Sequence, residues 1–315
     1  MSTVAVRTSD AIAPTFPRGQ ARSSPQHLLL TLFGDYWIGR VEALPSAALV
    51  ALLGEFGVSQ VSARAALARL ARRGLLELSR TGRHTSYSLS ERAATVLDEG
   101  IRHILTFGAK DPTWSGRWTL AAFSVPEEHR DLRHALRTRL GWLGFAPLYD
   151  GLWVSPHDRV GDAGRVLDEL GITTATLFQA SLCGDSPGGG DPVRAWDLET
   201  LRDQYGHLCA EYGPVARRLR AGGIGPAEAL TIRTAFMDAW RTMPTIDPDL
   251  PVDLLPPGWP RSPARALFIE LYDGLAGLSE QRVVQVVGRF DTDLARLVRS
   301  HTSVAARPAP RPRPH

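Results

Sequence analysis

The sequence almost lacks lysine: Lys110 is the only one, although lysine and arginine together number 36. Nearly every cationic side chain is therefore an arginine, so the positions of the arginines are informative, while the choice of arginine over lysine is not. The 33 acidic residues almost balance the cations and leave a formal net charge of only +3. Any strongly basic surface must therefore come from local clustering of arginines.

Cysteine and long apolar runs are also scarce. Cys183 and Cys209 are the only two cysteines, and their spacing fits neither a metal site nor a redox motif. No stretch approaches the roughly 20 apolar residues that a membrane helix requires. Residues 1–24 contain no apolar run that resembles a signal peptide. We therefore expect a cytoplasmic protein with no membrane partner, in which residues 1–24 form a disordered leader.

Two segments rich in glycine, proline and aspartate interrupt the chain. They are FGAKDPTWSG and CGDSPGGGDP, and their composition is typical of linkers or long loops. The chain ends on RPAPRPRPH, which predicts an extended tail. We predict an α+β fold of three domains and a tail: a winged helix-turn-helix over 25–107, a ferredoxin-like domain over 116–183, a mostly helical domain over 191–300, and a disordered tail over 301–315.

Start and stop signals define the helices of the first block. Ser24 followed by Pro25 marks one helix start. Ser59 can cap a later helix, and Gly74 can end it. The sequences LLELS and HTSYSLS then predict two short strands around the turn RTGR. This order of helix, helix, turn, helix and hairpin is typical of a winged helix-turn-helix.

The basic charge of the chain is concentrated in residues 56–90, which hold six arginines against one acidic residue, Glu77. On a helical wheel, the helix that follows Ser59 has one apolar face for the core and an opposite face of small side chains and arginines. The core face holds Ala63, Ala66, Leu67 and Leu70, and the opposite face holds Val61, Ala65 and Ala68.

Small side chains would let this helix approach the floor of a DNA major groove, where arginines read guanine or bind phosphate. A solvated basic helix is the alternative interpretation. The order of the elements and the basic hairpin together favour double-stranded operator DNA as the partner. The candidate DNA-binding residues are Ser59, Gln60, Ser62, Arg64, Arg69, Arg72, Arg80 and Arg83.

The middle block alternates in an orderly way between strand and helix patterns. RWTLAAFSV, the pair FAPLYDG and GLWVSP, and TTATLFQA predict strands, and two amphipathic helices lie between them. The resulting βαββαβ order is the signature of a ferredoxin-like domain. Such small sheets often associate through a face or an edge, so we expect this block to assemble a homodimer.

The third block combines helical periodicity with many aromatic residues and nearby arginines. Apolar walls with a few cations suit a small acidic ligand. Core packing of the aromatic residues is the alternative, and it is the better interpretation for most of them. The candidate effector-binding residues are Arg233, Trp240 and Arg241.

Five segments in a fixed order make the chain resemble the PaaX family of bacterial transcriptional repressors, named for control of phenylacetate degradation. They are LTLFGDYW, GVSQVSARAALARLARRGLL with GRHTSYSLS, LGWLGFAPLYDGLWVSP, RAWDLETLRDQY, and DPDLPVDLLPPGWPRSPARALFIELY. The resemblance implies a repressor of a catabolic operon that is released by a metabolite such as an aryl-acyl-CoA thioester. It also implies that the middle block is related to a small CRISPR-associated endoribonuclease.

The sequence departs from the family pattern in two places. Ala63, Arg64 and Ala65 stand where the family commonly has a Val-Arg-Thr-like run, so the operator sequence is expected to differ. Arg261 follows Trp-Pro at a position where glycine is frequent in the family, so the family pattern does not predict the conformation of this loop.

Two alternatives compete with the hypothesis of an effector-controlled repressor. A metal-dependent nuclease of the middle block would need a carboxylate where the first strand ends, but Ser124 and Val125 stand there, and Glu127 and Glu128 suit the first turn of a helix. A DNA-binding protein without an effector would need no ligand pocket. SPGGGDP does not match a phosphate-binding loop, so we expect neither a cofactor nor enzymatic activity.

Overall fold

The computed structural model describes residues 24–183 and 190–304, which form two compact units. The first unit takes the described residues of Met1–Thr106, Val215–Trp240 and Phe268–His315, and the second takes those of Phe107–Pro214 and Arg241–Leu267. The predicted leader, apart from Ser24, lies outside the described residues, as does the predicted tail beyond residue 304.

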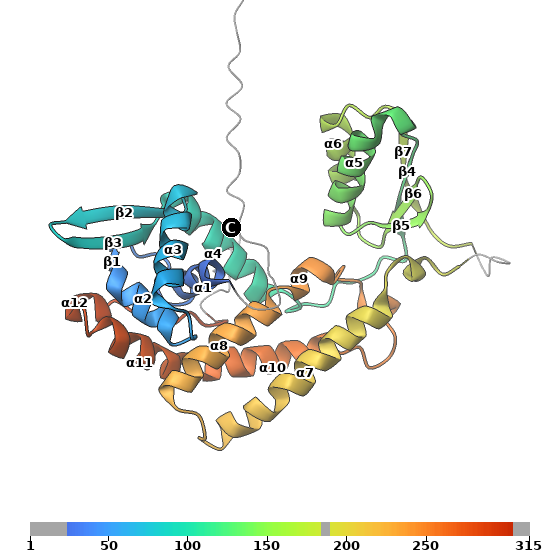
Figure 1. The fold of residues 1–315 in the computed structure, drawn as a ribbon. Coiled ribbons are helices and arrows are strands. Elements are labelled where there is room, and N and C mark those ends of the chain that lie inside the picture. The colour runs from blue at the N-terminus through green and yellow to red at the C-terminus, as the bar shows by residue number, and fades with distance from the viewer. Residues whose placement is uncertain (1–23, 184–189, 305–315) are drawn as a thin grey trace, which may run out of the picture. The chain divides into compact units, whose positions relative to one another are not determined.

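The first unit contains a three-stranded sheet at one side of a group of helices (Figure 1). Its sheet has the order β1-β3-β2, and all pairs are antiparallel. The chain passes between the units at four points, and two of these lie within the helices α7 (Leu198–Arg220) and α10 (Arg261–Gly274). The other elements are α1 (Pro25–Tyr36), β1 (Leu44–Pro45), α2 (Ser46–Gly54), α3 (Gln60–Arg72), β2 (Leu76–Thr81), β3 (His84–Leu89), α4 (Glu91–Thr106), α8 (Pro226–Trp240), α11 (Ala276–Val287) and α12 (Thr292–Ala295).

The predicted start and stop signals of the first unit are confirmed. The Ser24 hydroxyl accepts a hydrogen bond from the His27 amide at 3.3 Å, and Pro25 is the first helical residue of α1. Ser59 caps α3, where its hydroxyl accepts from the Ser62 amide at 3.2 Å. Gly74 follows α3 with a φ of 67°, a left-handed conformation in which glycine avoids steric strain.

Other elements of the first unit were not predicted. Helix α4 follows the hairpin directly, and its start is capped by Ser90, whose hydroxyl accepts from the Ala93 amide at 3.3 Å. Helix α11 ends at Val287, and Asp291 caps the short α12.

One hydrophobic core joins the first and last parts of the chain. Leu29, Phe33, Leu53 and Leu67 are buried in the same cluster as residues of the C-terminal helices. The C-terminal members are Leu230, Val283, Val286, Val287, Ala295 and Val298. Much of the predicted helical domain over 191–300 is therefore no separate body, because α8 and α11 complete the core beneath α1 and α2.

A buried ion pair lies within this core. The guanidinium of Arg233 is 3.3 Å from the carboxylate of Asp35, and both side chains are almost fully excluded from solvent. The hydroxyl of Tyr272 donates to the other carboxylate oxygen at 2.7 Å, and the Tyr272 ring stacks beneath Arg233, 3.9 Å from the guanidinium carbon. Arg233 also donates to the backbone carbonyls of Tyr272 and His301. The cluster thus connects α1, α8, α10 and the C-terminal segment.

The C-terminal segment is held further along by hydrogen bonds that its backbone amides donate. The His301 amide donates to the Asp35 carbonyl at 2.9 Å, and the Ser303 amide donates to Asp273 at 2.8 Å. Both residues belong to the predicted disordered tail, so the ordered chain extends at least three residues into that segment, to Ser303.

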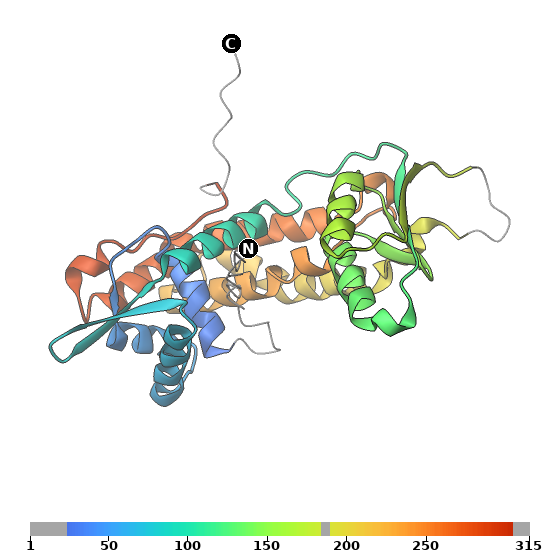
Figure 2. The ribbon, with the colours of Figure 1, turned by 90° about the horizontal axis from the view of Figure 1, so that it is seen from above.

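The second unit has a four-stranded antiparallel sheet with the order β5-β6-β4-β7. Figures 1 and 2 show two helices side by side against one face of the sheet. The observed order is βαββαβ, as predicted, and the two separate antiparallel sheets confirm the α+β class. Its elements are β4 (Trp118–Phe123), η1 (Glu127–His129), α5 (Arg130–Trp142), β5 (Ala146–Tyr149), β6 (Leu152–Ser155), α6 (Val160–Glu169), β7 (Ala175–Ala180), η2 (Pro192–Ala195), α9 (Met243–Ile246) and η3 (Val252–Leu254).

Strand alternation explains the two faces of this sheet. Ala121, Phe123 and Leu177 pack with the α5 and α6 side chains in one core. Successive side chains of a strand point to opposite faces, so Leu120 and its cross-strand partner Phe178 lie on the other face. Phe178 is 49% exposed there.

The buried ion pair predicts a large loss of stability when one partner is removed. Arg233→Leu leaves the Asp35 carboxylate buried without its cation, so the free energy of unfolding should fall by about 3–5 kcal/mol. Urea unfolding followed by circular dichroism measures this change. Arg217→Leu, at an exposed position of the same unit, should shift the free energy by less than about 0.5 kcal/mol. Equal effects of the two substitutions would contradict a structural role of the pair.

Candidate nucleic-acid interface

Helix α3 separates its side chains sharply into a core face and a solvent face. Ala63, Ala66, Leu67 and Leu70 are fully buried, as predicted. The opposite side is open, and Val61 there is 77% exposed. The packing of α3 against α1 and α2 therefore fixes which side chains reach an external partner.

The predicted arginines of α3 lie on its open side. Arg64, Arg69 and Arg72 are exposed, and no ion pair among the described residues involves any of them. Arg64 and Arg72 are two helical turns apart, which is about 12 Å along the axis. This face can approach a polyanion without first breaking an internal salt bridge.

The N-terminal turn of α3 is also exposed and already ordered. The hydroxyl of Ser59 donates to the hydroxyl of Ser62 at 3.0 Å while it caps the helix. Gln60 is exposed between them. Free amides and the helix dipole make such a turn favourable for phosphate oxygens. The main role of Ser59 is therefore to cap the helix. Gln60 and Ser62 remain exposed to solvent.

The hairpin of β2 and β3 carries the remaining predicted arginines. Arg80 lies near the end of β2, and Arg83 lies in the turn beside Gly82, whose φ is 61°. Both arginines are exposed, and Figures 1 and 2 show the hairpin projecting away from the helices of its unit. Leu76 and Tyr87 are buried at its base and fix the hairpin to the core. All eight predicted DNA-binding residues are thus exposed within one unit.

The three predicted effector residues have different surroundings. Arg233 is committed to the buried cluster around Asp35. Trp240 is fully buried, stacks on Phe268 at 4.8 Å between ring centroids, and donates to the Ile104 carbonyl at 3.3 Å. Arg241 is half-buried and belongs to the second unit. Arg233 and Trp240 therefore pack the core of the first unit and do not face solvent.

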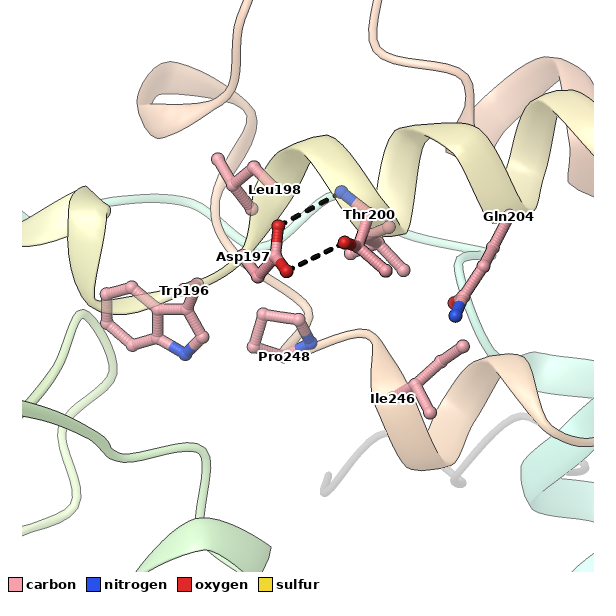
Figure 3. Close-up of a pocket in the computed structure, with 8 residues that line it drawn as sticks. Trp196, Asp197, Leu198, Thr200, Gln204, Ile246 and Pro248 are labelled. Carbon is pink, nitrogen blue, oxygen red and sulfur yellow. Dashed lines mark hydrogen bonds between the residues drawn. The ribbon is translucent and has the colours of Figure 1, made fainter.

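A shallow groove lies in the second unit at the start of α7 (Figure 3). It encloses about 190 Å³. The carboxylate of Asp197 accepts hydrogen bonds from the Thr200 amide at 3.0 Å and the Thr200 hydroxyl at 2.7 Å, and these bonds lower the pKa of Asp197. The lining carries no positive charge, so the groove suits an apolar group. Its lining residues are Trp196, Asp197, Leu198, Thr200, Leu201, Gln204, Ile246 and Pro248.

The far wall of the groove is held in place by Arg261. This residue is 2% exposed, and its guanidinium binds Asp247 at 3.0 Å and Asp249 at 2.9 Å. The Tyr205 hydroxyl donates to Asp247 at 2.6 Å. Asp249 has a φ of 52°, which costs free energy for a residue other than glycine. The ion pairs of Arg261 stabilise this turn, so an arginine at this position gives an ordered loop.

A second cavity of about 220 Å³ has a polar and charged lining. Arg117 and Asp158 line it together with His157, and burial lowers the pKa of His157. Trp118 also lines it and stacks on Trp196 of the groove, with 6.3 Å between the ring centroids. The stacked tryptophans thus lie between an apolar groove and a polar cavity. No local pattern predicts this arrangement, because the two tryptophans are 78 positions apart in different blocks.

Three family models match consecutive parts of the chain. They describe a PaaX-like protein over residues 24–93, the central Cas2-like domain of PaaX protein over residues 111–192, and the C-terminal domain of PaaX-like proteins over residues 196–285. The chain belongs to the PaaX family. This confirms the resemblance drawn from the sequence.

Individual relatives agree with membership of the PaaX family. The transcriptional repressor PaaX of Escherichia coli (strain K12) is 28% identical over 248 residues, which are 77% of this chain and 73% of the relative. This PaaX relative is a repressor and not an enzyme, in agreement with the prediction for this chain.

Among solved structures, the uncharacterized protein Rv0674 from Mycobacterium tuberculosis superimposes with a TM-score of 0.53 at 21% identity. The match covers 81% of this chain and 97% of that chain, and it shows the fold alone. In the part of the chain that the structure describes, no helix is long and apolar enough to cross a membrane.

Proposed function

We propose that this PaaX family member is a cytoplasmic, sequence-specific repressor that binds operator DNA through a winged helix-turn-helix formed by α2, α3 and the β2–β3 hairpin. The observation that carries the proposal is the open face of α3, where Arg64, Arg69 and Arg72 are exposed without an ion pair among the described residues. The name of the Escherichia coli relative supports repression. The regulated genes are proposed from the family to be a catabolic operon.

The side chains of the interface have separate roles in this proposal. Arg64 lies one turn into α3, within reach of base edges, and can donate two hydrogen bonds to guanine O6 and N7. Ser62, Arg69 and the hairpin arginines bind phosphates, which hold the helix in register without reading sequence. The projecting hairpin lets Arg80 and Arg83 contact the DNA backbone beside the groove that α3 occupies.

The two kinds of contact predict different mutant behaviour. Arg64→Ala should weaken binding to the operator by about 1–3 kcal/mol and leave binding to unrelated duplexes nearly unchanged. Arg80→Ala or Arg83→Ala should weaken both equally and reduce the salt dependence, because each removes one phosphate contact. Titrations of both duplexes at several salt concentrations measure this. Unchanged selectivity of Arg64→Ala would show that another face of α3 reads the operator.

We further propose that the protein acts as a homodimer assembled by the ferredoxin-like block of β4–β7 with α5 and α6. Two-fold symmetry would place two copies of α3 in successive major grooves, about 34–36 Å apart, on a palindromic or repeated operator. The open sheet face supports this role, because Phe178 is 49% exposed there beside Leu120. A second copy of the same face would cover these side chains.

The dimer proposal predicts that a charge on this face separates the subunits. Phe178→Glu should convert the dimer into a monomer in sedimentation velocity, because two carboxylates would face an apolar partner. Trp142→Glu is the matched control, since Trp142 is 79% exposed on α5 at the helical side of the sheet. A Phe178→Glu protein that sediments like the wild type would place the dimer contact elsewhere.

A small acidic effector is proposed to release the protein from DNA. Because Arg233 and Trp240 are buried, we place the effector site in the second unit, at the groove and cavity on either side of the stacked Trp118 and Trp196. The apolar groove suits an acyl group, and Arg117 suits an anion. An aryl-acyl-CoA thioester, which carries both, follows from the family resemblance. A ligand that favours the DNA-free state weakens DNA binding by the same coupling free energy.

The effector proposal predicts a selective response to thioesters. In a gel shift with the operator, an aryl-acyl-CoA should release the wild-type protein, and its free acid should not. Trp196→Ala and Arg117→Ala should each raise the thioester concentration needed for release without changing affinity for DNA. Release that is equally sensitive in both variants would move the site elsewhere. No release by any thioester would favour a repressor without this effector.

A metal-dependent nuclease is the weaker alternative for the second unit. Glu127 is engaged by Arg133 at 2.5 Å, and strand β4 ends at Phe123 without an acidic residue. Among the described residues, no three histidine, cysteine or acidic side chains converge on a possible metal position.

A further inference from the structure

Val61 occupies an unusual position for an apolar side chain. It is the second residue of α3 and is 77% exposed, while the core residues of the same helix are fully buried. With 3.6 residues per turn, Val61, Ala65 and Ala68 follow each other along the side of α3 opposite the core. An apolar stripe therefore runs down the middle of the open face.

Charged and polar residues flank this stripe on both sides. Gln60 and Arg64 lie along one side, and Ser62 and Arg69 lie along the other, all exposed. A stripe that served the packing of this chain would be covered by another element, yet Val61 contacts solvent. The most exposed apolar side chain of α3 thus lies between hydrogen-bonding side chains on both sides.

The floor of the major groove offers one apolar group, the C5-methyl of thymine. The methyl projects into the groove, where an exposed valine can contact it, while Gln60 beside Val61 has the donor and acceptor pattern that reads adenine. Ala65 and Ala68 are too short to cover the methyl if Val61 is shortened. A partner protein would also bury Val61, but it would leave the surrounding unpaired arginines without a reason.

We propose that Val61 is a specificity-determining residue that selects thymine in the operator by contact with its C5-methyl group. The inference rests on the proposed function, because it assumes that α3 lies in the major groove. It adds an apolar residue to the polar side chains proposed to contact DNA. It also predicts an A·T pair at a fixed position of each half-site, next to the pair read by Arg64.

A cycle of protein and DNA substitutions tests the contact. The operator is first selected from random duplexes with the wild-type protein, and each thymidine is then replaced singly by deoxyuridine, which lacks only the methyl. At one position per half-site, deoxyuridine should weaken wild-type binding about fourfold, the effect of one methyl group removed from contact. Val61→Ala should bind the thymidine operator about fourfold more weakly than the wild type does. Replacing that thymidine by deoxyuridine should then weaken the binding of Val61→Ala by less than about twofold.

Val41→Ala is the matched control, because Val41 is 87% exposed in the loop between α1 and β1. It should retain the full deoxyuridine effect. If deoxyuridine weakens the binding of the wild type and of Val61→Ala equally at every position, the thymine contact is refuted, but the proposed DNA binding is not. Loss of self-association in Val61→Ala, with unchanged DNA affinity, would make Val61 a protein contact. Failure of the wild type to enrich any duplex would instead refute operator binding itself.

Discussion

The ion pair of Asp35 and Arg233 holds the first unit together. It joins the helix that begins the described chain to helices near its end, and Tyr272 seals it from water. A buried ion pair adds little net stability over an apolar core, but the loss of either partner is costly. The ion pair instead specifies geometry. The Asp35 carboxylate can contact both Arg233 and Tyr272 only when α1, α8 and α10 are packed in one arrangement. The position of α3 above this core follows from that arrangement.

The two faces of α3 show how one short helix meets two demands. Ala63, Ala66 and the two leucines fill the core, and the spacing that buries them turns the arginines outward. Local signals at both ends, the Ser59 cap and the Gly74 turn, fix where the helix begins and ends. The direction of the arginines is thus a consequence of packing, and the charge needs no internal partner to orient it.

Local patterns allowed much of this fold to be predicted from the sequence. Caps, turns and strand alternation located α1, α3, the hairpin and the βαββαβ order. Helix α4 was not predicted, although Ala93, Ile101 and Leu105 are buried at helical spacing, because a winged helix-turn-helix is already complete at the hairpin. The partners of Arg233 and Arg261 could not be predicted, since a buried arginine has no local pattern. The candidate DNA-binding residues needed only local information, whereas the effector residues depended on distant contacts.

The shared core of the first unit has a consequence for synthesis. Its inner surface is made by α1 to α3 near the start of the chain and by residues as late as Val298. During translation the early helices leave the ribosome long before the residues that cover them. Domains with such distant contacts fold slowly, and their exposed apolar surface invites aggregation in the interval. The segment proposed to contact DNA is therefore made early, but its core is completed late, and a chain that stops short of its final helices lacks part of the core on which α3 packs.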